Sequence, residues 1–282
     1  MKLISQPKQI GRVPFLNAPK RGSVPVKDEL PILHAHVDVL PEQFDALLLT
    51  SDLQGIVMHQ GQSQLLGCAL AENWARQWAG QVGAAVERTG VILAGDLFSD
   101  ANATQRGASG DVRAVWQNFL LQGFPWVAGV QGNHDHFCAP AQSGEYSHQT
   151  EARQSAEVRH FEEQSGIHLL DCDVIKQGDL KIGGVGLVMG PPEVFGHREK
   201  DEWMMALDMV LEQGPDLLVL HESPQGSADQ PGRLIIAERL CKHQQPLLVV
   251  CGHVGWPDEP VLTLSELVQV INIDSRAVVI TV

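Results

Sequence analysis

Five short apolar runs stand out in the pattern of hydrophobic and polar positions along the chain. Each is rich in Leu and Val, lacks alternation, and stops at Gly, Asp or His, which is typical of strands buried on both faces of a sheet. They are residues 45–50 (DALLLT), 90–95 (GVILAG), 124–130 (FPWVAGV), 216–221 (DLLVLH) and 246–253 (PLLVVCGH). In open α/β sheets, ligands bind beyond the carboxyl ends of such strands.

The segments between these runs predict helices. Residues 66–90 carry apolar residues at helical spacing and should form a helix that ends at Gly90. Residues 111–123 should form a second helix, with Asp111 as the N-cap and Gly123 at its end. Further helices are expected at about 150–165, at 198–214 and at 232–244. In the helix at 198–214, Met204, Met205 and Met209 are interpreted as core residues.

Two other segments predict strands. Residues 168–189 should break into strands with a turn near Gly178 and Asp179 and begin a second sheet. The alternating residues 261–282 should form a last hairpin. By pattern alone, the chain is therefore expected to have a layered α/β fold.

Composition favours one compact, cytoplasmic domain. The 282 residues contain no linker run, internal repeat or low-complexity segment, so residues 1–282 are interpreted as a single domain. The five cysteines are scattered and form no CxxC pair, which argues for reduced thiols in the cytosol. The N-terminal residues lack the apolar core of a signal peptide, and no stretch approaches the length of a membrane span.

The net charge of −14 argues against a long nucleic acid as partner, because such partners are bound mainly through Lys and Arg. A local basic pocket remains compatible with this composition. Six basic residues lie in or beside segments expected at the rim of the site, and each is interpreted first as surface charge: Arg106, Arg113, Arg153, Arg198, Lys200 and Arg233.

Five polar segments follow or adjoin the predicted strands. They are SDLQG (51–55), GDLFSD (95–100), GNHDH (132–136), HESP (221–224) and GHVGW (252–256). Because strand ends meet at one edge of the sheet, five side chains should converge on one rim: Asp52, Asp96, Asn133, His221 and His253. Carboxylates, an amide and imidazoles are the donors that a catalytic divalent metal requires.

In this order and spacing, the segments resemble the calcineurin-like metallophosphoesterase superfamily, over roughly residues 45–257. The resemblance implies a four-layer αββα sandwich of two mixed sheets flanked by helices. The chain departs from the family pattern at two positions. Gln54 stands where the family has a histidine in its first motif, and Gly255 replaces the second histidine of its last motif.

The resemblance implies two metal positions that share Asp96. One set of ligands, Asp96, Asn133, His221 and His253, is complete and predicts one tight site for Mn, Fe, Zn or Mg. The other set, Asp52, Gln54 and Asp96, has lost both imidazoles. This second site should be weak and should prefer Mn²⁺, Mg²⁺ or Ca²⁺ over Zn²⁺.

The residues after Asn133 match the catalytic positions of the family. His134 is expected to protonate the leaving oxygen, and Asp135 to orient His134. Among the remaining histidines, His136 is the best candidate for a further pocket residue.

The resulting hypothesis is a metal-dependent phosphoesterase acting on a small phosphate ester, a monoester or a diester such as a nucleotide. A metal-activated hydroxide would attack phosphorus, with His134 as the general acid. The alternative is a catalytically impaired pseudo-enzyme with one metal that binds a nucleotide or a protein. The two lost imidazoles favour this alternative, whereas the retained His134 and Asp135 favour the enzyme.

Overall fold

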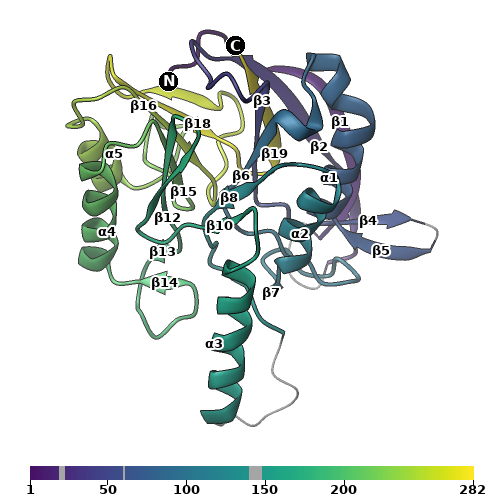
Figure 1. The fold of residues 1–282 in the computed structure, drawn as a ribbon. Helices are drawn as coiled ribbons and strands as arrows, with labels where there is room; N and C mark the ends of the chain where they lie inside the picture. The colour runs from purple at the N-terminus through teal and green to yellow at the C-terminus, as the bar shows by residue number, and fades with distance from the viewer. Residues whose placement is uncertain (19–22, 60, 140–147) are drawn as a thin grey trace.

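Two mixed β-sheets stacked face to face form the centre of the protein (Figure 1). The computed structural model describes residues 1–18, 23–59, 61–139 and 148–282, and for residues 148–153 it describes the main chain only. The side chain of Arg153 therefore lies outside the described part.

The larger sheet carries four of the parallel strands that lead to the site. Its strand order is β10-β8-β6-β3-β19-β2-β1-β4-β5, and β3, β6, β8 and β10 run parallel to one another. The strands are β1 (Lys8–Asn17), β2 (Val26–His36), β3 (Ala46–Ser51), β4 (Ile56–His59), β5 (Gln62–Leu65), β6 (Thr89–Leu93), β8 (Val127–Gly129), β10 (Ile167–Leu169) and β19 (Arg276–Thr281).

The smaller sheet has the strand order β11-β12-β15-β16-β18-β17, in which β12, β15, β16 and β18 are parallel. Its strands are β11 (Val174–Gln177), β12 (Leu180–Val185), β15 (Leu217–Leu220), β16 (Leu247–Cys251), β17 (Val261–Thr263) and β18 (Val268–Asn272). The expected turn between β11 and β12 is confirmed, with Gly178 at φ +59°.

The C-terminal hairpin was predicted only in part. Strands β17 and β18 form an antiparallel pair in the smaller sheet. Strand β19, however, crosses to the larger sheet and pairs with β2 and β3. Its residues Ala277–Ile280 are fully buried, so the alternation of the preceding residues does not extend to the chain end.

Helices cover the outer faces of both sheets (Figure 1). On the larger sheet lie α1 (Leu66–Asn73), which continues as a π-helical turn (Trp74–Trp78) and a 3₁₀ turn (Ala79–Val82), and α2 (Arg113–Leu121). On the smaller sheet lie α4 (Lys200–Glu212) and α5 (Leu234–Leu240). Helix α3 (His148–Glu162) projects away from the sheets (Figure 1).

Three expectations about the helices were wrong in detail. The helix predicted to end at Gly90 stops earlier, because Gly83 takes a left-handed conformation after the 3₁₀ turn and Gly90 belongs to β6. Val112, and not Asp111, precedes α2 at its N-cap position, while Asp111 accepts a hydrogen bond from the Arg113 N–H. Met205 and Met209 face solvent, with 64% and 54% of their surface exposed.

Three hydrophobic clusters fill the spaces between the four layers. The central cluster lies between the two sheets and includes Leu47, Ile92, Leu217, Val250 and Ile280. The other two lie under α1 and α2 and under α4 and α5. This arrangement confirms the αββα sandwich of mixed sheets. In the described part of the chain, no helix is long and apolar enough to cross a membrane.

Candidate metal centre

The candidate site lies where the central strands of both sheets end. Asp52 follows β3, Asp96 follows β6 by a short turn, and His253 follows β16. All three adopt left-handed backbone conformations, with φ of 53°, 56° and 66°, which is uncommon for residues with a side chain. The sharp turns point these side chains back over the sheet edge.

Hydrogen bonds between the strand ends hold the turns together. The Asp52 N–H donates to the Gly95 carbonyl at 2.9 Å, and the Gly252 N–H donates to the His221 carbonyl at 3.2 Å. The His253 N–H donates to Asp52 Oδ2 at 2.9 Å, which joins the end of the smaller sheet to the end of the larger one.

Three side chains predicted from the sequence meet at metal-binding distances. One ligand atom each from Asp96, His221 and His253 lies within 4.8 Å of the others. Asn133 joins this group, because its Oδ1 lies 3.0 Å from His221 Nε2. Asp96 Oδ1 lies 3.6 Å from the same nitrogen. The structure therefore brings together all four residues of the complete ligand set.

His221 is in the protonation state that can bind a cation through its Nε2 atom. Its Nδ1 lies 2.7 Å from the Ala94 carbonyl, which can only accept, so Nδ1 carries the proton. Burial lowers the pKa of His221, which keeps the ring neutral and leaves a lone pair on Nε2. That lone pair faces the oxygens of Asn133 and Asp96. Three acceptors that point at one another match the donor set of a divalent metal.

The neighbouring histidine is also neutral. Burial, followed by the nearby His221, lowers the pKa of His253 to about 3. The two rings lie with their centroids 5.0 Å apart. A neutral imidazole is the form that binds a metal, so both histidines are in the ligand form at neutral pH.

Asp96 is held by main-chain and side-chain donors. Its Oδ1 accepts a hydrogen bond from the His134 N–H at 2.9 Å, and its Oδ2 accepts one from Gln54 Nε2 at 3.0 Å. Burial raises the pKa of Asp96 to about 6, and His134 and Arg106 offset this effect only in part. A bound cation would favour the ionised form.

Asp135 accepts hydrogen bonds from the main chain, and the orienting role expected from the resemblance stays a prediction. Its carboxylate accepts hydrogen bonds from the N–H groups of Asp96, Leu97 and Gly132 at 2.8, 2.8 and 3.0 Å. Burial, followed by the charge of Asp96, raises the pKa of Asp135 to about 7. Asp135 thus shapes the loop that carries Asp96.

Ser109 contacts the imidazole ring of His134. Its Oγ lies 3.0 Å from His134 Nδ1, which leaves Nε2 as the nitrogen available to a substrate. Gly107, at φ +74°, lies against this ring: a Cβ added there would come within 3.3 Å of His134 Nε2. The loop before α2 therefore packs directly on the proposed general acid.

The residues of the second ligand set are arranged differently from the first. Gln54 donates its amide N–H to Asp96 Oδ2, while its Oε1 accepts from the Gly107 N–H at 3.2 Å. Asp52 Oδ2 accepts from Ser51 Oγ at 2.7 Å and from the His253 N–H. Burial, then Asp274 and Asp96, raise the pKa of Asp52 well above its ordinary value.

Asp274 is a site residue that the sequence reasoning missed. It is buried, and a Cβ added at Gly255 would lie 3.4 Å from its Oδ1. Asp274 therefore occupies the region toward which a histidine at position 255 would extend. The signal in the sequence is a carboxylate that follows an apolar strand, in the segment INID (271–274) at the end of β18.

Most basic residues near the rim are paired with acids. Arg113 contacts Asp111 and Glu157, and Arg198 contacts Asp171 at 2.7 Å. Arg233 forms an ion pair with the buried Glu222 and a hydrogen bond to the Met189 carbonyl. Arg106 lies 3.8 Å from Asp274 Oδ1. Lys200 begins α4 and is exposed.

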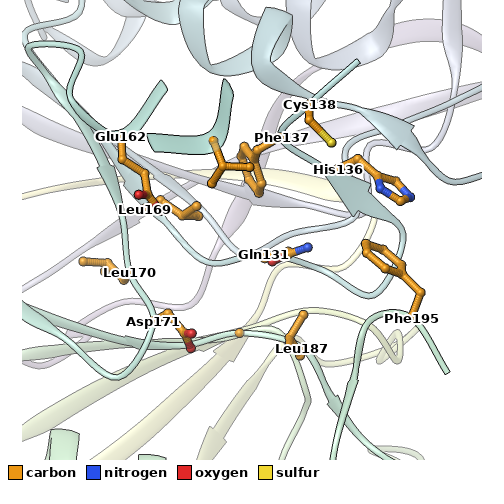
Figure 2. A pocket seen from close by; sticks show the side chains of 12 residues that line it. Gln131, His136, Phe137, Cys138, Glu162, Leu169, Leu170, Asp171, Leu187 and Phe195 are labelled. Carbon is orange, nitrogen blue, oxygen red and sulfur yellow. The ribbon is translucent and has the colours of Figure 1, made fainter. Parts of the chain in front are cut away.

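A cavity of about 210 Å³ is lined partly by the segment after β8 (Figure 2). The same segment carries Asn133. Gln131, His136 and Cys138 line it, together with Leu187, just after β12, and Phe195, from the loop between β13 (Val188–Met189) and β14 (His197–Arg198). At one end, the rings of His136 and Phe195 stack with centroids 4.0 Å apart and planes 6° apart. His136 therefore lines this cavity, and its place in the pocket of the metal site stays a prediction.

The loop that carries Phe195 packs on the ligand loop. A Cβ added at Gly196, which has φ +79°, would lie 2.5 Å from Asn133 Cα. Only a glycine allows the two main chains to approach so closely. The loop that bounds one end of the cavity thus contacts Asn133.

Comparison with family models and with curated proteins finds no match for the chain. Among solved structures, a 5′-nucleotidase from Candida albicans is similar, with a TM-score of 0.43 and 12% sequence identity. The match covers 92% of this chain and 47% of that chain, so this chain spans about half its length. At so low a TM-score, the likeness supports no conclusion about function.

Proposed function

We propose that the chain is a metal-dependent hydrolase of small phosphate esters. The observation that carries this proposal is the group of acceptors formed by Asp96, Asn133, His221 and His253, in which a neutral, buried imidazole lone pair faces two oxygens. These four residues would hold Mn²⁺ or another divalent ion.

The metal and His134 would have separate roles. A divalent ion held by these ligands would activate water and offset negative charge on the phosphoryl oxygens. His134, with Nδ1 directed to Ser109, would present Nε2 to the leaving oxygen and protonate it. Asp135 would support the reaction indirectly, by fixing the main chain of Asp96 and Leu97.

The cavity lined by Gln131 and His136 would receive the alcohol part of the ester. Its stacked rings of His136 and Phe195 and its apolar side chains suit a small organic group. The acidic net charge makes a long nucleic acid an unsuitable substrate.

Hydrolysis of p-nitrophenyl phosphate and bis(p-nitrophenyl) phosphate tests the proposal. We expect turnover with Mn²⁺, loss of turnover with a chelator, and loss of both metal binding and turnover in His253→Ala. His36→Ala is the matched control, because His36 is an exposed histidine in β2 whose ring contacts Ser5. If the wild type loaded with Mn²⁺, Mg²⁺, Zn²⁺ or Fe²⁺ hydrolyses neither ester, the proposal that the chain is a phosphoesterase is refuted.

A binding module with one metal is the second candidate. The amide of Gln54, which donates to Asp96 Oδ2, favours it because a hydrogen-bond donor occupies a carboxylate oxygen that a second metal would need. Nucleotide binding in calorimetry without any hydrolysis would identify this candidate.

A further inference from the structure

The second metal position implied by the resemblance does not fit the residues present. Gln54 turns an N–H group, and not its oxygen, toward Asp96, and its oxygen is engaged by the Gly107 N–H. Among the described residues, the cluster of acids and histidines at metal-binding distances contains Asp96 but neither Asp52 nor Asp274. The donors of a second cation are therefore not assembled.

Three buried carboxylates nevertheless meet in this region. Asp52, Asp96 and Asp274 are exposed by 7%, 2% and 6%, and the charge of Asp274 acts on both other carboxylates. Buried charges are costly unless a cation is near. A positive group in this region would offset the negative charge of these carboxylates in their ionised form.

Arg106 is placed to supply that charge. Its Nη2 lies 3.2 Å from Ser275 Oγ and 3.8 Å from Asp274 Oδ1, and its charge acts on Asp96. The neighbouring residues fix its position, because the Gly107 N–H binds Gln54 and Ser109 binds His134. The Gly110 N–H also donates to the His134 carbonyl. Arg106 thus lies on a loop anchored to both sides of the site.

We propose that the centre holds a single metal and that Arg106 replaces the second one, by binding a phosphoryl oxygen of the substrate. The catalytic part of this inference rests on the proposed function. The side chain of Arg106 is 45% exposed, so N–H groups that do not face Asp274 are open to a ligand. A guanidinium also binds phosphate through paired N–H groups, which a lone ammonium cannot do.

Metal content and phosphate binding test the inference without any turnover. Elemental analysis and Mn²⁺ calorimetry of the wild type should give one ion per chain. Calorimetry of the Mn²⁺-loaded protein with inorganic phosphate should show binding that is about tenfold weaker in Arg106→Ala, or about 1.4 kcal/mol. Arg106→Lys should lose less, and added guanidinium should partly restore phosphate binding in Arg106→Ala.

Arg12→Ala is the matched control, because it removes one positive charge from an exposed pair with Glu29 in the β1–β2 hairpin. Its phosphate affinity should equal that of the wild type. Two tightly bound ions in the wild type would overturn the inference. A phosphate affinity of folded Arg106→Ala equal to that of Arg12→Ala would do so as well.

The same measurements separate this inference from the proposed function. A protein that binds one Mn²⁺ and binds phosphate through Arg106, but hydrolyses no ester, would refute the hydrolase and leave the role of Arg106 as a phosphate ligand. An active hydrolase with two tightly bound metals would support the proposed function and refute the inference of a single metal assisted by Arg106.

Discussion

The close approach of Gly132 to Asp96 gives a sharp test of how the site is built. A Cβ added at Gly132 would overlap with Asp96 Oδ1 and with the Asp96 main-chain nitrogen, and would lie 2.9 Å from Asp96 Cγ. A main-chain nitrogen cannot move away by a change of rotamer. Gly132→Ala must therefore push the loop after β8 away from the loop after β6.

The expected loss of folding stability in Gly132→Ala follows from the cause of the strain. Gly132 is not among the glycines with positive φ, so the substitution acts through steric overlap and not through backbone conformation. Overpacking of this kind costs about 1–3 kcal/mol. For a chain of this size each kcal/mol lowers the melting temperature by about 2–4 °C. Because Asp96 is displaced, Mn²⁺ affinity should also fall, by about tenfold or more.

Thermal melting with chelator and Mn²⁺ calorimetry measure the two effects separately. Gly80→Ala is the control, since a Cβ added at Gly80, in a 3₁₀ turn, would meet nothing within 4 Å. We expect the control to melt at or above the wild-type temperature. If Gly132→Ala melts like Gly80→Ala and binds Mn²⁺ equally well, then the loops after β6 and β8 do not approach as described.

Three further predictions address the chemistry of the site. His134→Gln should slow esters of poor leaving groups far more than an activated aryl ester, in kcat/KM, and equal losses on both would show that His134 positions phosphate instead. Phe195→Ala should raise KM for aryl phosphates relative to methyl phosphate, and an unchanged ratio of the two KM values would exclude the cavity as the place of the leaving group. Without metal, melting temperature should fall as pH rises from about 6.5 to 8, because the raised pKa values of Asp96 (about 6) and Asp135 (about 7) favour the folded state only while these groups keep their protons. Below about pH 6.5 the lowered pKa values of His221 and His253 act in the opposite direction, so the prediction is limited to this window. Mn²⁺ should raise the melting temperature more at about pH 8 than at about pH 5, and a metal-free melting temperature that rises between about pH 6.5 and 8 would contradict this.

The buried strands were predictable from the sequence because their composition alone carries the signal. Strands β3, β6, β15 and β16 are buried at every position, so apolar residues dominate each of them without alternation. The hairpin of β1 and β2 was not predicted. Both strands are half-exposed, and their mixture of charged, proline and apolar residues shows neither a run nor a clean alternation.

In the candidate site, too, some residues could be predicted from the sequence and others could not. The ligands that end buried strands could be named from the sequence, because a strand end fixes where its next residue lies. Ser109 could not, since a loop of undetermined course brings it to the site. Arg106 was named only as one of six basic residues at the rim, and its contact with Asp274 could not be predicted. Asp274 also follows a buried strand and was overlooked. The hydrogen bonds of Asp135 could not be predicted, because three main-chain N–H groups donate to its carboxylate and the sequence shows no main-chain geometry.

The backbone at Asp52, Asp96 and His253 supplies an argument for function that does not depend on any resemblance. Each has a positive φ, a conformation that costs a residue with a side chain about 1–2 kcal/mol and that glycine adopts freely. Stability alone would favour glycine at these positions. Two carboxylates and an imidazole stand there instead, and all three side chains lie at the same edge, joined by the hydrogen bond from His253 to Asp52 and by the metal-binding distances between Asp96 and His253. Strain of this kind persists where the surrounding structure enforces it, and it concentrates at functional sites. The conformational cost of three turns in one place is therefore best explained by the ligands that those turns present.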